Sequence, residues 1–283
     1  MRKSNILLVS LTAILSSTAH SWEKDDCPST EAACFAVSKE NRPQISPNLK
    51  SGKIVFAFGS NGDGCLASSP VGEIAGELKP NPGIKDTGAR NGHCAYANQL
   101  EKATVAVSEF KTNVDGDEYS ARMFSVYFVK DQGPTTGWGH RHDWEDVVIW
   151  SKNGNIEYIG ASQHGPIHNY KSQDVPHLKG QPNVYAFKYV IHKGTHNFSK
   201  AQGKNSSGEF IPTNTNPTPS GKWFGEAEDI YLDFSDFSEK SSNYWSVIKN
   251  ADFGKATFKA GNSSYINKNI PAGWPKSLIF KAK

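Results

Sequence analysis

Short apolar runs, separated at close intervals by Gly, Asn, Ser and Pro, constrain the fold of this chain more than any other feature. Runs of this length and composition predict strands, here at residues 54–58, 123–129, 147–150 and 184–191. Helical patterns are fewer: residues 244–251 predict a short helix before Gly254, and residues 98–106 fit either a helix or a strand. Many strands and few helices predict a mainly β (α+β) fold, in which helices flank a central β-sandwich.

The stretch 203–221 is polar and rich in Asn, Thr, Ser and Pro, which predicts an exposed loop. The aromatic-rich composition of the chain continues after this stretch, so we do not interpret it as a domain boundary. Residues 22–283 are therefore predicted to form a single domain, and this length is ample for a hydrophobic core.

The first 21 residues have the pattern of a secretory signal peptide. Two basic residues precede an apolar run at residues 6–15, and small residues follow it. The run is too short to remain as a membrane anchor. We expect cleavage near Ala19 or Ser21, a mature chain that begins near Trp22, and a secreted, extracellular protein.

The charge of the mature chain limits its partners. The formal net charge of the whole chain is +3, and loss of Arg2 and Lys3 with the leader lowers it to +1. A nearly neutral protein has no overall attraction to nucleic acid or to anionic membranes. We therefore expect no nucleic-acid partner, and any membrane recognition must be local. A monomer is expected.

Four cysteines follow the leader, and an even number in an exported chain favours disulfides. Three pairings are possible. The simplest pairs Cys27 with Cys34 and Cys65 with Cys94, because each bond then closes a loop within one local segment. A zinc site is the competing interpretation, but the spacings lack the usual C-x-x-C pairs.

The segment from Asp131 to Trp150 carries a dense group of acids and histidines. Residues 139–145 read GHRHDWE and lie between a glycine-containing loop and the apolar run 147–150. Extension of that strand backwards places Asp143 and Glu145 on one face with Val147 and Ile149. His140 can then approach the two carboxylates from the loop.

Two neighbouring carboxylates repel each other unless a proton, a cationic side chain or a metal ion lies between them. Arg141 is close in sequence, so a structural ion pair is one explanation. The alternative is a metal site, for which Asp131 supplies a third acid. Carboxylate oxygens with one imidazole suit Mg²⁺, Mn²⁺ or Ca²⁺ better than structural zinc.

The heptapeptide GHRHDWE resembles the signature of the necrosis-inducing NLP cytolysins. Residues 121–131, which precede it, resemble the strand that leads into the family's signature loop. Shorter similarities extend over most of the mature chain, at residues 63–65, 76–80, 195–196 and 252–256. The resemblance implies the family's fold, a β-sandwich with flanking helices and an architecture like that of the actinoporins.

The resemblance also implies a divalent cation, most simply Mg²⁺ or Ca²⁺, in a surface cavity. By motif, its ligands are Asp131, His140, Asp143 and Glu145, although the loop between Asp131 and His140 is one residue longer than the family pattern. Four further positions are interpreted as neighbours of this cavity. His142, His164 and His196 are expected at its rim or behind the ligands, and Trp138 is a candidate for membrane contact.

A secreted cytolysin is the function that the resemblance implies. The cation would coordinate a sugar of the glycosyl inositol phosphorylceramide head group, a sphingolipid of plant plasma membranes, and the membrane would then leak. Residues 121–145 also resemble a peptide region that a plant immune receptor detects. The rival functions are a metal-dependent polysaccharide hydrolase or lyase, and a non-toxic glycan-binding homologue. No second basic residue is obviously paired with the acids as a lyase base, so we predict that the chain is not an enzyme.

Overall fold

The larger of two main sheets contains six strands in the order β14-β4-β5-β6-β7-β8. The computed structural model describes residues 25–59, 63–134, 137–192, 194–207, 210–216, 221–236 and 238–281, so the predicted leader and Trp22 lie outside the described residues. Every pair in this sheet is antiparallel except β14 with β4. The strands are β4 (Val105–Val114), β5 (Asp117–Gln132), β6 (Gly139–Lys152), β7 (Asn155–Ser162), β8 (Ile167–Lys171) and β14 (Tyr231–Asp233).

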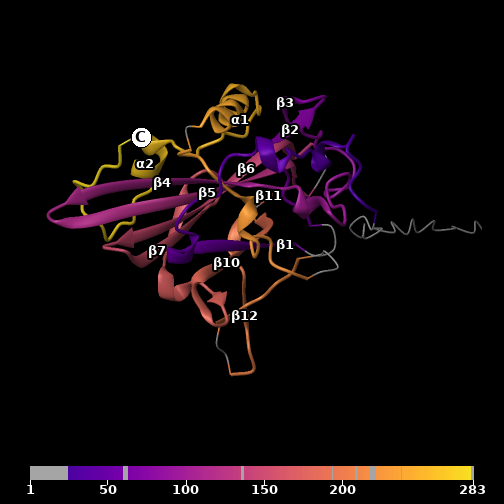
Figure 1. Cartoon of the computed structure of the whole chain (residues 1–283). Helices are drawn as coiled ribbons and strands as arrows, with labels where there is room; N and C mark the ends of the chain where they lie inside the picture. The colour runs from indigo at the N-terminus through magenta and orange to yellow at the C-terminus, as the bar shows by residue number, and fades with distance from the viewer. Residues whose placement is uncertain are drawn as a thin grey trace, which may run out of the picture.

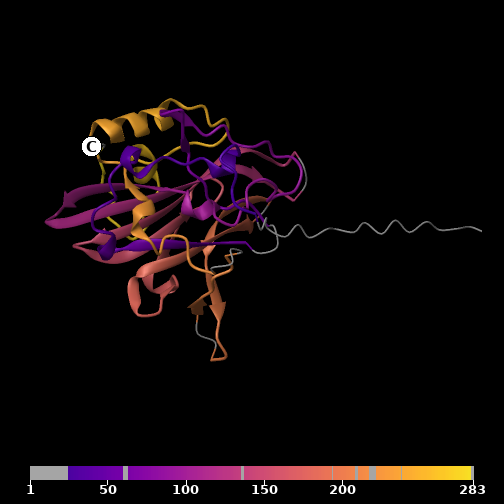
Figure 2. The ribbon, with the colours of Figure 1, turned by 45° about the vertical axis from the view of Figure 1, so that its right-hand side comes forward.

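The second sheet lies against one face of the first (Figure 1). Its central strand β10 (Gln181–His192) pairs in parallel with β1 (Lys53–Phe58) and antiparallel with β11 (Thr195–Lys200) and β9 (His177–Leu178). Helices α1 (Glu239–Asn250) and α2 (Ser263–Lys268) lie on the opposite side of the six-stranded sheet, as Figures 1 and 2 both show. The predicted sandwich with flanking helices is thus confirmed.

Alternation along β5 explains how the six-stranded sheet is buried on both faces. Phe124 and Phe128 point toward the second sheet, where the ring of Phe128 stacks on Tyr189 with 3.7 Å between the ring centres. Tyr119 and Met123 point the other way and pack in a separate cluster with Trp274 and other residues of the C-terminal segment. Because both faces are covered, the strand is apolar along most of its length.

The remaining elements are short. Two hairpins stand apart from the main sheets, β2 (Val71–Ile74) with β3 (Glu77–Pro80) and β12 (Gln202–Lys204) with β13 (Phe210–Pro212). The 3₁₀ turns are η1 (Ala32–Cys34), η2 (Lys39–Asn41), η3 (Leu49–Ser51), η4 (Gln99–Glu101), η5 (Ser172–Asp174) and η6 (Glu228–Ile230). No helix among the described residues is both long and apolar enough to span a bilayer.

The predicted strands are confirmed within β1, β5, β6 and β10, and the predicted helix 244–251 lies largely within α1. The ambiguous region 98–106 contains the turn η4 and the first residues of β4. The prediction of one continuous loop at 203–221 is wrong in part, because backbone hydrogen bonds pair β12 with β13 inside it. The loop predicted before the heptapeptide is shorter than expected, since β6 already begins at Gly139.

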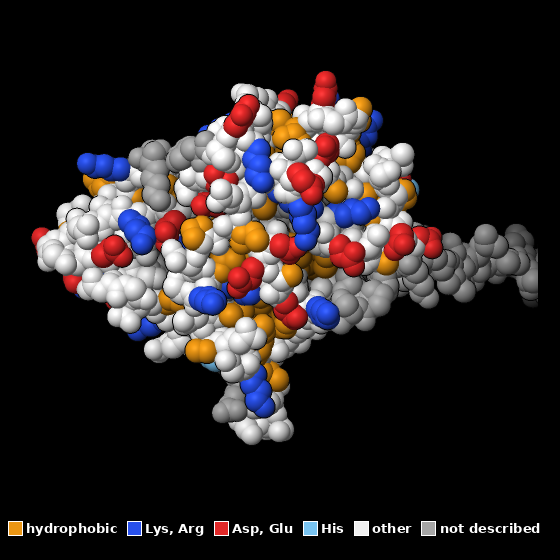
Figure 3. Space-filling view, viewed as in Figure 1, with side chains coloured by type: hydrophobic (Ala, Val, Ile, Leu, Met, Phe, Trp, Pro, Cys, Tyr) orange, Lys and Arg blue, Asp and Glu red, His pale blue; other side chains and the backbone are white. Residues whose placement is uncertain are grey.

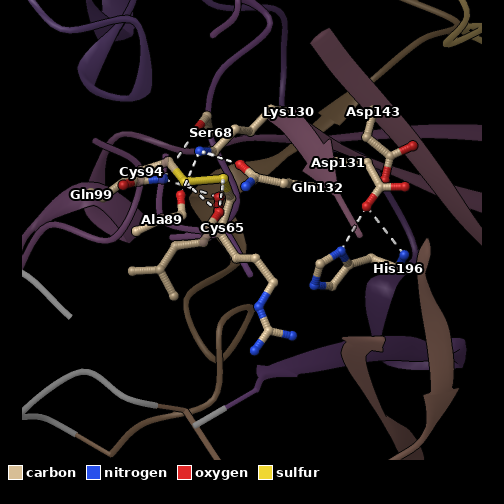
Figure 4. Close-up of a disulfide and its surroundings, with 12 residues drawn as sticks. Cys65, Ser68, Ala89, Cys94, Gln99, Lys130, Asp131, Gln132, Asp143 and His196 are labelled. Atoms are coloured by element: carbon tan, nitrogen blue, oxygen red, sulfur yellow. Dashed lines mark hydrogen bonds and ion pairs between the residues drawn. A yellow bond between two sulfur atoms is a disulfide. The ribbon is translucent and has the colours of Figure 1, made fainter. Parts of the chain in front are cut away.

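Both predicted disulfides are confirmed. Cys27 is bonded to Cys34 and Cys65 to Cys94, with Cα atoms 5.4 Å and 5.0 Å apart. All four cysteines are therefore used, which removes the alternative of a zinc site built on them. The second bond joins the segment after β1 to the segment before η4, next to the acidic residues described below (Figure 4).

Candidate functional site

Three carboxylates lie buried between the two sheets at one end of the sandwich. Asp143 and Glu145 come from β6 and Asp131 from the end of β5, and their residues are only 6%, 7% and 2% exposed. Asp143 and Glu145 share the face of Val147 and Ile149, which pack in the core between the sheets. The predicted shared face is therefore confirmed.

A β-bulge brings Asp131 to the same place. The register between β5 and β6 shifts after Phe128, and both Arg141 and His142 lie opposite Lys130. His142 has a left-handed backbone with φ of 61°, which is uncommon outside glycine. Strict alternation would turn Asp131 to the face of Met123, but the shift turns its carboxylate toward β11 of the second sheet instead.

The second sheet supplies hydrogen bonds to two of these acids. Tyr189 Oη donates to Asp143 Oδ2 over 2.7 Å. His196 contacts Asp131 Oδ1 through both its ring Nδ1 at 2.7 Å and its backbone N–H at 3.2 Å (Figure 4). The other ring nitrogen of His196 lies 2.6 Å from the carbonyl oxygen of Asp63, so this histidine is held at both ends.

Glu145 is held from within the six-stranded sheet. The hydroxyl of Ser162, at the end of β7, donates to Glu145 Oε2, and the oxygen of this hydroxyl accepts from the backbone N–H of Asp146. Tyr189 and Ser162 were not predicted as site residues. Tyr189 lies in a predicted strand with no local signal of a polar role, and no motif marks Ser162.

The acids have little positive charge near them. Burial, followed by the charge of Asp131, raises the pKa of Asp143 to about 7. Burial and the charge of Asp143 also raise the pKa of Glu145 well above its ordinary value. The carboxylates therefore resist ionisation together unless a cation joins them.

The alternative of an ion pair with Arg141 is wrong. The guanidinium of Arg141 donates to the backbone carbonyls of Pro82 and Gly83, at 2.8 Å and 2.9 Å, and no described carboxylate accepts from it. The lysine that does reach this part of β6, Lys259, lies 3.7 Å from Asp146. Arg141 thus anchors the neighbouring loop instead of neutralising the acids.

The predicted histidines have different surroundings. His140 Nδ1 lies 2.6 Å from the backbone carbonyl of His142, which leaves Nε2 as its free nitrogen. The ring of His142 contacts Tyr127 and Phe253. Only the backbone carbonyl of His142 therefore contacts a candidate ligand, His140. His164 is exposed on the turn after β7, next to Thr195.

Trp138 lies beside the acidic cluster, on the turn between β5 and β6. Its carbonyl accepts a hydrogen bond from the N–H of Gly133, which closes the turn, and Trp138 is 66% exposed. An exposed indole at the rim of a buried polar cluster is suited to contact with a membrane interface. The role predicted for Trp138 remains a prediction, and its exposure is compatible with it.

The donor chemistry of this cluster suits a hard divalent cation, because buried carboxylates with raised pKa values gain most from a positive charge. In the part of the chain that the structure describes, no group of three or more His, Cys, Asp or Glu side chains is arranged to hold a metal ion. A cation would therefore draw Asp131 from His196 and Asp143 from Tyr189. We define Asp131, His140, Asp143 and Glu145 as the acidic site.

The fold and the buried acids together define a class of β-sandwich proteins with flanking helices. The solved structure described as "Toxin fold as basis for microbial attack and plant defense" aligns with 82% of this chain and 94% of its own, at 20% identity and a TM-score of 0.55. The structure of the non-toxic HaNLP3 protein aligns over 87% of this chain and all of its own, at 18% identity and a TM-score of 0.56. These likenesses establish the fold and do not distinguish toxic from non-toxic members.

The sequence assigns the family. The model of the necrosis inducing protein (NPP1) family matches residues 58–268, and the chain belongs to this family. It is 32% identical to NLP effector protein 2 of Plasmopara viticola over 127 residues, which are 44% of this chain and 52% of that protein. It is 27% identical to NLP effector protein 14 of Phytophthora capsici over 154 residues, which are 54% of this chain and 98% of that protein.

The chain spans about half the length of the first of these relatives. The matched proteins are named as effectors and toxin folds, and the family is not one of enzymes. The prediction that this chain is not an enzyme is confirmed at that level, and the rival hydrolase or lyase has no support from the family.

Proposed function

We propose that this chain is a secreted cytolysin that binds a sugar-bearing lipid head group through a divalent cation in the acidic site. The observation that carries the proposal is the burial of Asp131, Asp143 and Glu145 together, with the pKa of Asp143 raised to about 7. Such a site is costly to keep empty and ionised, and a cation with open coordination positions accepts sugar hydroxyls readily.

The residues in and around the acidic site would have different roles. Asp131, Asp143 and Glu145 would supply carboxylate oxygens and His140 its free nitrogen, and the cation would supply a hard Lewis-acidic centre for the sugar. Tyr189 and Ser162 orient the two acids of β6. Trp138, on the adjacent turn, would enter the membrane interface once the head group is bound.

The solved relatives support a sugar ligand in a general sense. One neighbour is described as NLPPya in complex with mannosamine, with 20% identity and a TM-score of 0.54. The class of lipid that we propose for this chain is the glycosyl inositol phosphorylceramide of plant plasma membranes. Extracellular action at such a membrane agrees with the effector names of the matched relatives.

Vesicle leakage tests the proposal. We expect dye release from vesicles that carry the glycosylated sphingolipid, none from vesicles of phosphatidylcholine alone, and loss of release on addition of EDTA. Restored release after addition of excess Ca²⁺ or Mg²⁺ is the control for damage by the chelator. Leakage that is indifferent to EDTA would contradict the role of the cation.

A non-toxic glycan-binding homologue is the second candidate, because the non-toxic HaNLP3 structure is as similar as the others. The same vesicles distinguish the two functions. A glycan-binding protein would sediment with sphingolipid vesicles in a cation-dependent manner and would release no dye.

We also propose that a plant immune receptor detects residues 121–145. This segment forms most of β5 and the first half of β6, and it is largely buried in the sandwich. A receptor would therefore bind this segment only after unfolding or proteolysis of the protein. A synthetic peptide of residues 121–145 should trigger defence responses where the intact, protease-resistant protein does not, and silence of the peptide in all tested plants would contradict the proposal.

A further inference from the structure

Two turns meet at the rim of the sandwich, and each presents a histidine. His164 lies on the turn between β7 and β8 of the six-stranded sheet, and His192 ends β10 of the second sheet. The centres of the two imidazole rings are 6.1 Å apart, with 32° between the ring planes. The pair thus spans the two layers of the fold, and His192 has no part in the proposed function.

We propose that His164 and His192 form a binding site for a divalent transition-metal ion such as Zn²⁺, Ni²⁺ or Cu²⁺. Two imidazoles that bind one ion at a tetrahedral angle have ring centres roughly 5 Å apart, since each metal–nitrogen bond is about 2.0–2.1 Å. The observed separation of 6.1 Å is about 1 Å larger, so the two side chains would rotate toward each other to place one nitrogen of each ring on a shared ion. Imidazole nitrogen selects these metals over Mg²⁺ and Ca²⁺, so the site differs in preference from the acidic site.

A hydrogen-bond partner and the local backbone favour His164 as a metal ligand. Thr195 Oγ1 lies 3.0 Å from Nδ1 of His164, so the ring can donate its N–H to the hydroxyl and keep the lone pair of Nε2 for the metal. His164 has a left-handed backbone with φ of 54°, and this turn holds the ring exposed at the rim. The side-chain amide of Asn197 lies 3.5 Å from Nδ1 of His192, which is too long to fix the tautomer of that ring.

The protein supplies two ligands, and water or an added ligand completes the coordination. Within the described ranges no third His, Cys, Asp or Glu joins the pair in a group that could hold a metal. The ion would link the turn after β7 to the hairpin between β10 and β11. Binding to the folded state alone would raise the melting temperature in proportion to the metal concentration.

Calorimetric titration of the tag-free protein with NiCl₂ and ZnCl₂, in excess Mg²⁺, tests the site. We expect one ion per wild-type chain and a rise in melting temperature. His164→Gln and His192→Gln should each remove both effects, and Thr195→Val should weaken binding about tenfold or more, since loss of an outer partner typically costs 10–100-fold. His168→Gln, which changes an exposed histidine of β8, is the matched control and should bind as wild type.

Two results would overturn the proposal: unchanged binding in both His164→Gln and His192→Gln, or an equal loss of binding in His168→Gln. Asp143→Asn should bind the transition metal as wild type, which separates this site from the acidic site. Electron paramagnetic resonance of the Cu²⁺ complex of wild type needs no variant. Hyperfine coupling to two imidazole nitrogens is expected, and coupling to none or one would refute the pair.

Discussion

Asp143→Asn is expected to abolish cation-dependent leakage while it preserves or raises the stability of the metal-free protein. Asn keeps the shape of the side chain and an acceptor for the hydroxyl of Tyr189, which now bonds to Asp143. It removes one of three buried negative charges, so the repulsion that raises the pKa of Glu145 falls. It also removes a charged ligand from a cation with few protein ligands, and leakage should fall to the level of EDTA-treated wild type.

The pH dependence of stability gives a second test of the Asp143→Asn variant. The pKa of Asp143 is raised from 3.8 to about 7 in the folded protein, so protonation of this group stabilises the fold. That contribution is fully present below the unfolded pKa and is lost as the pH rises through about 7. In EDTA, the wild type should therefore melt at a lower temperature at pH 8 than at pH 5.5, and Asp143→Asn should flatten this trend.

Glu109→Ala is the matched control, because Glu109 is a strand carboxylate with a true cationic partner. Its Oε1 lies 2.8 Å from Arg122 Nη2, and Arg122 is buried. Removal of Glu109 leaves a buried guanidinium short of charge compensation, so stability should fall while leakage per folded molecule stays near that of wild type. If Asp143→Asn instead lost stability as Glu109→Ala does and still released dye, the acidic site would be structural.

Local sequence patterns predicted the strands because each apolar run is long enough to form one buried strand of a sheet. The same pattern placed Asp143 and Glu145 on the face of Val147, where the structure has them. The motif also pointed to Asp131, but alternation alone would have turned it away. A register shift after Phe128 turns the Asp131 side chain toward the second sheet. Such a β-bulge depends on how β5 pairs with β6, so the periodicity of the sequence does not reveal it.

The contacts of the acids with the second sheet could not be derived from local spacing. His196 is 65 residues from Asp131, and Tyr189 is 46 residues from Asp143. These pairs form only because β10 and β11 pack across the six-stranded sheet, and packing between sheets is not encoded in local spacing. The family resemblance placed His196 near the cavity, whereas nothing in the sequence marked Tyr189 as a partner of Asp143.

Loss of the Cys65–Cys94 disulfide is expected to cost the most stability of any change considered. The bonded cysteines are separated by 29 residues, for which the chain-entropy model gives about 3–4 kcal/mol. For a domain of this size that corresponds to a fall of roughly 6–16 °C in melting temperature. The double variant Cys65→Ala/Cys94→Ala, measured by calorimetry, tests this expectation.

The other disulfide provides a control with the same number and kind of substitutions. Cys27 and Cys34 are separated by 7 residues, so the same model gives only about 2–2.5 kcal/mol for Cys27→Ala/Cys34→Ala. All four cysteines are buried, so the penalty for lost packing is similar in the two variants and largely cancels. Equal losses from both variants would show that loop length does not set the effect.

The two disulfides should also differ in their effect on the acidic site. Cys65 lies two residues after Asp63, whose carbonyl oxygen is 2.6 Å from the ring of His196 and whose carboxylate lies 3.5 Å from Arg90. The Cys65–Cys94 bond ties this segment to the segment that carries Arg90, and its loss would free the carbonyl that orients His196 against Asp131. Leakage at a temperature where both variants are folded should therefore need more cation in Cys65→Ala/Cys94→Ala than in Cys27→Ala/Cys34→Ala. An unchanged cation requirement would mean that the bond supports the fold without positioning the site.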